Sequence, residues 1–214
     1  MAHTQKVNVI GGKLYYMLFF SCAGKILEQQ KLLNKINVYP VPDADTGTNL
    51  ASTLRAVIDN VQPSNSFTAT ADAIAIAALN GARGNSGVIF AQFLYGMSQE
   101  SKKAEDLSIQ NFAEVIKRSV KYVYEALAEP VEGTMLTVIR EWADFIYSQK
   151  DKIDDFISLF LKAYEIALNS LRDTTSKLKA LQIANVVDAG AKGFVLFLEG
   201  VLEGLRKKDH KRSI

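Results

Sequence analysis

Hydrophobic positions recur every three or four residues along most of the chain, a spacing that places apolar side chains on one face of a helix. The first such face runs from about Gly12 to Asn34, and others follow between turn residues as far as about Leu205. About eight helices are predicted in this way. Only one short stretch, residues 6–10 (KVNVI), is a candidate strand. The chain is therefore predicted to be all-α, with no sheet.

Turn and capping residues set the expected helix boundaries. The second helix is expected to stop before Pro63, and an alanine-rich third helix near Gly81. Ser86 is expected to cap the next helix, and Ser108 the one after it. Further helices are expected from Gly133–Thr134, around Phe156 and after residues 188–190. No low-complexity linker divides them, so we expect one domain at 10–206, with an arm at 1–9 and a basic tail at 207–214.

Composition narrows the function classes. The 214 residues carry a net charge of +2, which implies no nucleic-acid partner. A single cysteine, Cys22, excludes an intrachain disulfide and favours a cytoplasmic location. The histidines, His3 and His210, stand at opposite ends, so neither a His-based catalytic triad nor a His-rich metal site is expected. The apolar run LYYMLFF is too short to cross a membrane, and no transmembrane segment is expected.

Four joints between expected helices share a small, polar, glycine-bearing composition. They are DADTGTN (43–49), GARGNSG (81–87), EGT (132–134) and DAG (188–190), and each immediately precedes a helix. A helix N-terminus presents unpaired N–H groups and partial positive charge, which attract phosphate, and glycine lets the backbone approach a ligand closely. If the helices are antiparallel, alternate joints lie at one end, where all four can converge on one ligand.

Two carboxylates, Asp43 and Asp45, stand two residues apart in the first joint, behind Pro40 and Pro42. Such a pair in a stiff loop suits Mg²⁺, which takes one or two carboxylates together with phosphate oxygens and water. Taken alone, each joint has a simpler reading, because an Asp-x-Asp before a helix usually caps it and a glycine turn usually only turns. The same small, polar, glycine-bearing sequence precedes a helix at four joints, and this repetition favours a phosphate site.

The stretches NVYPVPDADTGTN (37–49), GARGNSGVI (81–89), EGTMLTV (132–138) and VVDAGAKG (186–193) occur in this order. Together they resemble the nucleotide-binding domain of the DhaL family of dihydroxyacetone kinases. Within that family, the likeness is to the N-terminal domain of bacterial fatty-acid kinases of the FakA, or YloV-like, type. The resemblance implies an antiparallel eight-helix barrel with ATP and Mg²⁺ at one end.

The resemblance also implies roles for individual residues. Asp43 and Asp45 would be the catalytic Mg²⁺ ligands, and Asn37 stands near the place of a third ligand. The family usually has glycine where this chain has Ala44, and since alanine tolerates a positive φ poorly, we expect this loop to differ slightly. The residues implied in nucleotide binding are Thr46, Gly47, Thr48, Asn49, Gly84, Asn85, Ser86, Gly87, Thr134, Asp188, Ala189 and Gly190.

The implied reaction moves the γ-phosphoryl group of ATP to the carboxylate of a fatty acid, which a separate FakB-like binding protein presents. Kinases of this type continue well beyond such a domain, so we expect weak turnover from this part alone. Two alternatives stay open. One is a dihydroxyacetone-kinase-type subunit acting on a small ketone, in which histidine stands where this chain has Thr46. The other is a non-catalytic bundle that binds a lipid or a partner. For the barrel itself, the resemblance implies a partly unfilled interior that can take up an adventitious acyl chain but does not hold the substrate.

Overall fold

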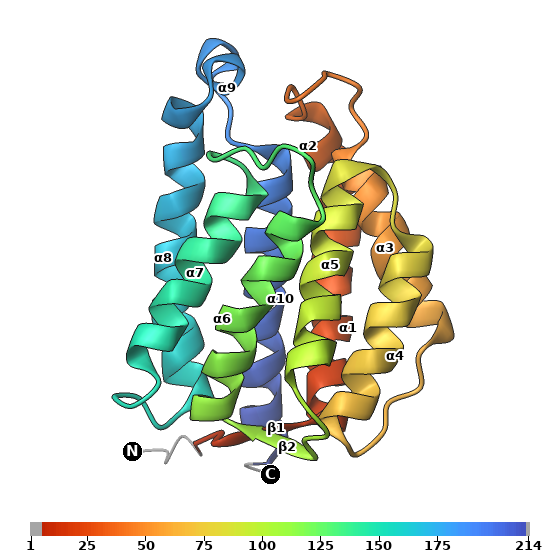
Figure 1. Cartoon of the computed structure of the whole chain (residues 1–214), viewed down its shortest axis with the longest axis vertical. Coiled ribbons are helices and arrows are strands. Elements are labelled where there is room, and N and C mark those ends of the chain that lie inside the picture. The colour runs from red at the N-terminus through yellow and green to blue at the C-terminus, as the bar shows by residue number, and fades with distance from the viewer. Residues whose placement is uncertain (1–5, 213–214) are drawn as a thin grey trace.

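The computed structural model describes residues 6–212, and the side chains of residues 6–207 (Figure 1). Within these residues, eight helices have 15 or more residues and two have six. In chain order the elements are β1 (Val9–Gly11), α1 (Gly12–Glu28), α2 (Gln30–Lys35), α3 (Thr46–Asn60), α4 (Phe67–Gly81), α5 (Gly84–Glu100), β2 (Asp106–Ser108), α6 (Ile109–Glu125), α7 (Met135–Gln149), α8 (Phe156–Lys177), α9 (Lys179–Ala184) and α10 (Ala189–Arg212). The prediction of an all-α fold is confirmed.

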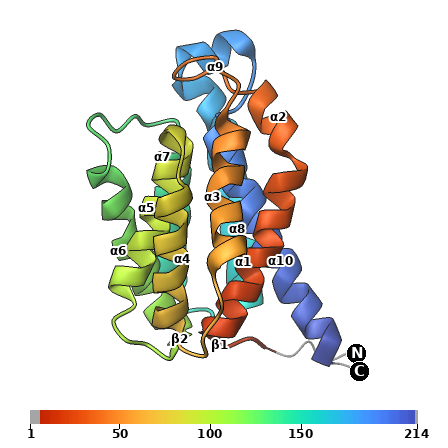
Figure 2. The same ribbon diagram turned by 90° about the vertical axis from the view of Figure 1, so that its right-hand side faces the viewer.

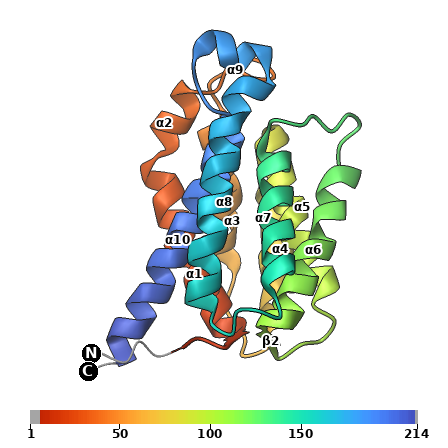
Figure 3. The ribbon, with the colours of Figure 1, turned by 90° about the vertical axis from the view of Figure 1, so that its left-hand side faces the viewer.

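Consecutive long helices run in alternate directions, so the joints before α3, α5, α7 and α10 all lie at one end of the bundle (Figure 1). Each long helix packs on the next from α3 to α8, α8 packs on α10, and α10 packs on α1. Helix α1 in turn packs on both α3 and α4, which closes the circuit of packed neighbours. Figures 2 and 3 show the two sides of this bundle.

The expected first helix is divided in two. It breaks at Gln29, and α2 continues as a separate short helix. Contacts with the start of α3 hold α2 in place, because Gln30 Nε2 and Asn34 Nδ2 donate to Thr48 Oγ1 at 3.1 and 3.0 Å. Asn34 Oδ1 accepts from the backbone N–H of Thr48 in return. No proline or glycine marks the break, so periodicity alone could not locate it.

The prediction of no sheet is corrected by a small antiparallel ribbon. β1 pairs with β2, with Val9 opposite Ser108 and Gly11 opposite Asp106. The candidate strand at residues 6–10 thus lies partly in β1. Three residues a side are too few to form a layer of the fold. The ribbon joins the start of α1 to the joint before α6, at the end of the bundle opposite the four glycine-bearing joints (Figure 1).

Several expected helix starts are confirmed by their caps. Ser108 Oγ accepts from the N–H of Asn111 at the start of α6, and Thr134 Oγ1 accepts from the N–H of Leu136 at the start of α7. The cap expected at Ser86 is wrong. Helix α5 begins two residues earlier, at Gly84, and Ser86 is the third residue of the helix.

Large aromatic side chains fill the interior of the bundle. Phe93, Phe194 and Trp142 lie edge to face within one cluster. An apolar cavity beside them has a volume of about 40 Å³. This cavity is too small for an acyl chain, so the interior room expected for one is not found there.

Helix α10 continues through Arg212, so the first part of the expected basic tail is helical. His3 and residues 1–5 lie outside the described part of the chain, as does the side chain of His210. Among the described residues, no helix is both long and apolar enough to span a lipid bilayer.

Candidate functional site

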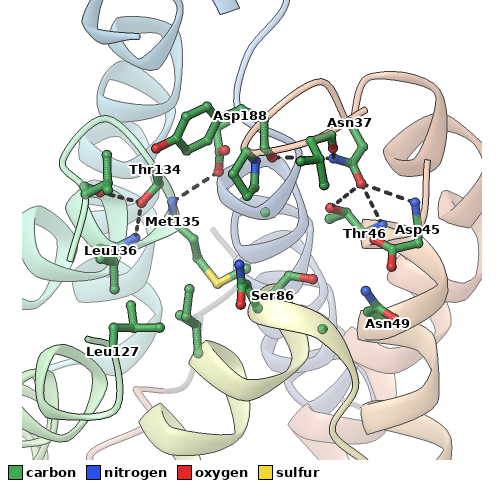
Figure 4. Close-up of a pocket in the computed structure, with 18 of the residues that line it drawn as sticks. Asn37, Asp45, Thr46, Asn49, Ser86, Leu127, Thr134, Met135, Leu136 and Asp188 are labelled. Carbon is green, nitrogen blue, oxygen red and sulfur yellow. Dashed lines mark hydrogen bonds between the residues drawn. The ribbon is translucent and has the colours of Figure 1, made fainter. Parts of the chain in front are cut away.

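The four glycine-bearing joints meet around one pocket of about 520 Å³ (Figure 4). This volume lies within the usual range of small-molecule sites, roughly 300–1,000 Å³. The N-termini of α3, α5, α7 and α10 supply its lining, although up to about 150 residues of sequence separate them. Because each N-terminus carries partial positive charge, the pocket suits an anionic ligand.

The lining divides into a polar side and an apolar side. In Figure 4, Asp45, Thr46 and Asn49 lie on one side, Leu127 and Leu136 on the other, and Ser86 lies between them. The candidate residues that line the pocket are Asn37, Asp43, Asp45, Thr46, Asn49, Gly84, Asn85, Ser86, Thr134, Asp188 and Gly190. One pocket therefore offers both polar groups for charged atoms and an apolar wall for a ring.

Asn37 anchors the loop that carries the two aspartates. Its Oδ1 accepts three hydrogen bonds, from the N–H of Asp45 at 3.2 Å and from the N–H and Oγ1 of Thr46 at 3.0 and 2.8 Å. Its Nδ2 donates to the backbone carbonyl of Val41 at 3.2 Å. The side chain is buried, with 4% of its surface exposed. It fixes the loop conformation from inside.

This arrangement does not fit the expected role of Asn37 as a metal ligand, because three donors already occupy the oxygen that would bind the cation. Asp43 and Asp45 both line the pocket, the first exposed and the second half-buried. Across residues 6–207 there is no cluster of three or more histidine, cysteine, aspartate or glutamate side chains placed to hold a metal ion. A cation in this pocket would be held by these two carboxylates and by the molecule bound beside it.

Ala44 adopts a left-handed conformation, with φ at 55°. This region costs an L-residue roughly 1–2 kcal/mol, and glycine adopts it freely. The chain therefore accepts strain between the two aspartates. Strain of this kind is often kept where a loop must present particular groups.

The starts of α3 and α5 touch at the pocket. Gly84 has φ at 56°, and a Cβ atom built on it would lie 2.1 Å from Asn49 Nδ2. Asn49 and Ser86 are almost fully buried, with 8% and 9% exposure, and both line the pocket. The glycine thus gives the Asn49 amide its room beside the start of α5.

Four of the expected binding residues do not line the pocket. Thr48 holds α2, as described above, and a Cβ atom on Gly47 would lie 2.2 Å from the carbonyl oxygen of Gln30. A Cβ atom on Gly87 would lie 2.9 Å from Thr53 Oγ1, so this glycine permits close packing of α5 on α3. Ala189 is buried in the first turn of α10. These positions support the walls of the site from behind.

Asp188 joins two helix starts. Its Oδ1 accepts from the N–H of Met135 at 3.1 Å, at the start of α7, and from the N–H of Ala191 at 2.7 Å, at the start of α10. Its own N–H donates to Thr174 Oγ1 on α8. Burial raises the pKa of this carboxyl to about 6. Asp188 is therefore a structural tie that also lines the pocket.

The apolar side of the pocket was missed by reasoning from sequence. Its residues have no polar or glycine signature, and two of them, Leu127 and Val131, lie in the joint between α6 and α7, around Pro130. The residues of this side are Ile89, Leu127, Val131, Met135 and Leu136. The one sequence signal for this wall is a hydrophobic residue in a joint between helices, because such joints lie on the surface and often carry function.

Comparison with known proteins places the chain in a family. The model of the DAK2 domain matches residues 40–203. The chain is 35% identical over 202 residues to an uncharacterized protein of Staphylococcus epidermidis, 37% over 203 residues to one of Staphylococcus saprophyticus and 33% over 202 residues to one of Staphylococcus aureus. Each alignment covers 94% of this chain and 37% of the relative, so the chain spans little more than a third of the relatives' length.

Solved structures of the dihydroxyacetone kinase of C. freundii share the fold. The native form has a TM-score of 0.66 at 14% identity, and the complex with AMP-PNP and Mg²⁺ has 0.63 at 16%. Each match covers 95% of this chain and 36% of the kinase chain. At such identity the likeness shows the fold alone. The family match, which covers most of the chain, shows that this protein belongs to the DAK2 domain family.

Proposed function

We propose that this chain is the nucleotide-binding part of a kinase and that it binds ATP with Mg²⁺ in the pocket at the end of the bundle. One observation carries the proposal, the convergence of four helix N-termini and their glycine-bearing joints on a pocket of about 520 Å³. Membership of the DAK2 domain family supports it. So does the fold shared with a dihydroxyacetone kinase that was crystallised with AMP-PNP and Mg²⁺.

Asp43 and Asp45 fit a hard divalent cation. Both line the pocket, and among the described residues neither carboxylate accepts a hydrogen bond or forms an ion pair. Mg²⁺ usually takes one or two carboxylates and completes its shell with water and phosphate oxygens. When bound, the ion would neutralise negative charge on the phosphates.

The two sides of the pocket suggest how the nucleotide lies. The phosphates would contact the starts of α3 and α5, where Thr46, Asn49 and Ser86 stand. The base would rest against the apolar wall that includes Leu127 and Leu136. Phosphoryl transfer needs little from a protein beyond positioning and charge stabilisation, which this division provides.

For the phosphoryl acceptor, we propose a fatty acid presented by a separate, FakB-like binding protein. The carboxylate oxygen attacks the γ-phosphorus, the bond to the ADP oxygen breaks, and the products are an acyl phosphate and ADP. A carboxylate is already a nucleophile, so no base is required. The small interior cavity supports presentation by a partner, because a space of about 40 Å³ cannot hold the acyl chain.

A ketone acceptor is the second candidate, favoured by the fold shared with dihydroxyacetone kinase. The resemblance places histidine in such kinases where this chain has Thr46, whose hydroxyl is bonded to Asn37. A non-catalytic lipid carrier is disfavoured by the filled interior. Incubation with Mg-ATP and hydroxylamine separates the acceptors: a fatty acid on its binding protein yields a hydroxamate, whereas dihydroxyacetone on its binding protein yields a sugar phosphate.

Calorimetric titration with Mg-ADP tests the nucleotide site. We expect saturable binding that Asp43→Asn and Asp45→Asn each weaken while the protein stays folded. Asp151→Asn, an exposed aspartate in the joint at the opposite end, is the matched control and should bind as wild type does. Nucleotide at 100 times its Kd should raise the free energy of unfolding by about 2.7 kcal/mol. Absence of binding by the wild-type chain would refute the proposal.

A further inference from the structure

The joint between α6 and α7 forms one wall of the pocket, yet little apolar burial holds it. Residues 126–134 connect the two helices, and the joint contributes Leu127, Glu129, Val131 and Thr134 to the lining. From residue 124 to residue 132 no residue is buried. Tyr124 and Leu127 pack only partly against the core. Segments with few fully buried contacts open readily, so polar contacts contribute to the position of this wall.

The Glu132 carboxylate accepts three of those hydrogen bonds. Glu132 Oε1 accepts from Tyr124 Oη at 2.8 Å and from Arg140 Nη1 at 2.6 Å, while Oε2 accepts from Thr137 Oγ1. Thr137 Oγ1 also accepts from the N–H of Gly133 at 2.7 Å. We call these side chains the Glu132 clasp. It joins the last turn of α6 to the first two turns of α7, across the joint that forms the wall.

The clasp acts as an ionised unit at neutral pH. Burial opposes the charge of Glu132, but the hydroxyls of Thr137 and Tyr124 and the charge of Arg140 outweigh it and lower the pKa of this carboxyl. Arg140 is placed further by Glu141, and Glu141 also pairs with Lys177 on α8. A single exposed ion pair is worth little, but several donors on one carboxylate form a network that holds one geometry.

We propose that Glu132 is a positioning residue, which holds the joint between α6 and α7 in the shape that receives the nucleotide base. The inference rests on the proposed nucleotide binding. It adds that different residues position the base and the phosphates. The clasp governs the apolar wall, whereas the phosphate side is built by the starts of α3 and α5. Loss of the clasp should therefore weaken contacts with the base and leave contacts with the phosphates intact.

The test compares two probes, Mg-ADP and Mg-tripolyphosphate, by calorimetry on the whole chain. Glu132→Gln should weaken Mg-ADP binding by roughly five- to tenfold, as expected for one charged hydrogen-bonded group. The affinity for tripolyphosphate, which has no base, should stay unchanged. Tyr124→Phe, which removes one hydroxyl, should act in the same direction by a smaller factor and keeps the test available if Glu132→Gln folds poorly.

Asp144→Asn is the matched control. Asp144 on α7 pairs with Lys117 on α6, so the pair joins the same two helices with similar exposure, but outside the pocket. Both probes should bind this variant as they bind wild type. Unchanged Mg-ADP affinity in Glu132→Gln, or an equal loss for both probes, would overturn the inference. If the wild-type chain binds tripolyphosphate but not Mg-ADP, or binds neither, the proposed function itself fails.

Discussion

At the scale of single residues, the pocket is shaped by exceptions to ordinary backbone preference. Ala44 and Gly84 both have left-handed φ angles, and each adjoins residues proposed to bind the ligand. Only one of them is glycine, so the chain accepts strain at Ala44 and avoids it at Gly84. The surroundings explain the difference, because a Cβ atom at Gly84 would collide with Asn49.

Gly84→Ala is expected to damage the site selectively. The added Cβ atom would displace the Asn49 amide and strain the start of α5, so Mg-ADP affinity should fall roughly tenfold, as a loss of 1–2 kcal/mol implies. Gly24→Ala on the exposed face of α1 is the control, since a Cβ atom there meets nothing within 4 Å. That variant should bind normally and be slightly more stable. Equal binding by the two variants would contradict this account of Gly84.

Asp188 predicts a pH dependence of stability. Its pKa of about 6 in the folded protein lies above the unfolded value of roughly 3.9, so the folded state binds more protons between these pH values. The contribution of Asp188 to the free energy of unfolding is therefore most favourable below about pH 4 and is lost as the pH rises to about 6. Asp188→Asn, whose amide oxygen still accepts both N–H groups, should show a flatter profile in denaturant titrations over this range. An unchanged profile would show that Asp188 does not titrate there.

At the scale of elements, each end of the bundle is fastened by capping side chains. Asp155 is the clearest case at the end opposite the pocket. Its Oδ2 accepts from the N–H of Ser158 at 2.8 Å at the start of α8, and its Oδ1 accepts from the N–H of Val7 at 2.9 Å. One carboxylate thus caps a helix and ties the segment before β1 to it.

Asp155→Ala should lower the free energy of unfolding by about 1–2 kcal/mol, because a cap is lost and the N–H of Val7 loses its partner. Asp155→Asn, which keeps an acceptor oxygen, should lose less. Chemical denaturation measures both effects. Mg-ADP affinity should stay the same in both variants, since Asp155 lies at the far end from the pocket, and a marked change in affinity would show coupling between the two ends.

At the scale of the whole molecule, the apolar interior holds the helices together, and the pocket proposed to bind nucleotide lies at one end. The apolar cavity beside Trp142 is small, whereas the large pocket lies where the four joints meet. Charged ligands bind at a polar end without being buried among apolar groups, which would be costly. The packed helices thus hold the four joints in place around the pocket.

The filled interior predicts that the purified chain carries no acyl chain inside the bundle. Native mass spectrometry should give the mass of the polypeptide alone, and organic extraction should release no stoichiometric lipid. A tightly bound lipid would contradict this expectation, because it would require the aromatic cluster to open. That outcome would leave the proposed nucleotide site unaffected.

The sequence by itself predicted the eight long helices and the end of the molecule at which the polar, glycine-bearing joints lie. Amphipathic periodicity and capping residues act within a few turns, so they can be recognised locally, as the caps at Ser108 and Thr134 show. Alternating helix direction then brings alternate joints together, which is why the sequence alone groups the four glycine-bearing joints.

Only the tertiary structure decided which residues line the pocket and which support those residues. Gly47 and Thr48 stand within the most distinctive motif, yet they pack on α2. The side-chain oxygen of Asn37 accepts hydrogen bonds from the loop itself. No sequence pattern predicts the contacts that form the apolar wall and the Glu132 clasp. Periodicity reports which face of a helix is buried, but not what that face meets, because long-range contacts depend on how all the helices pack at once.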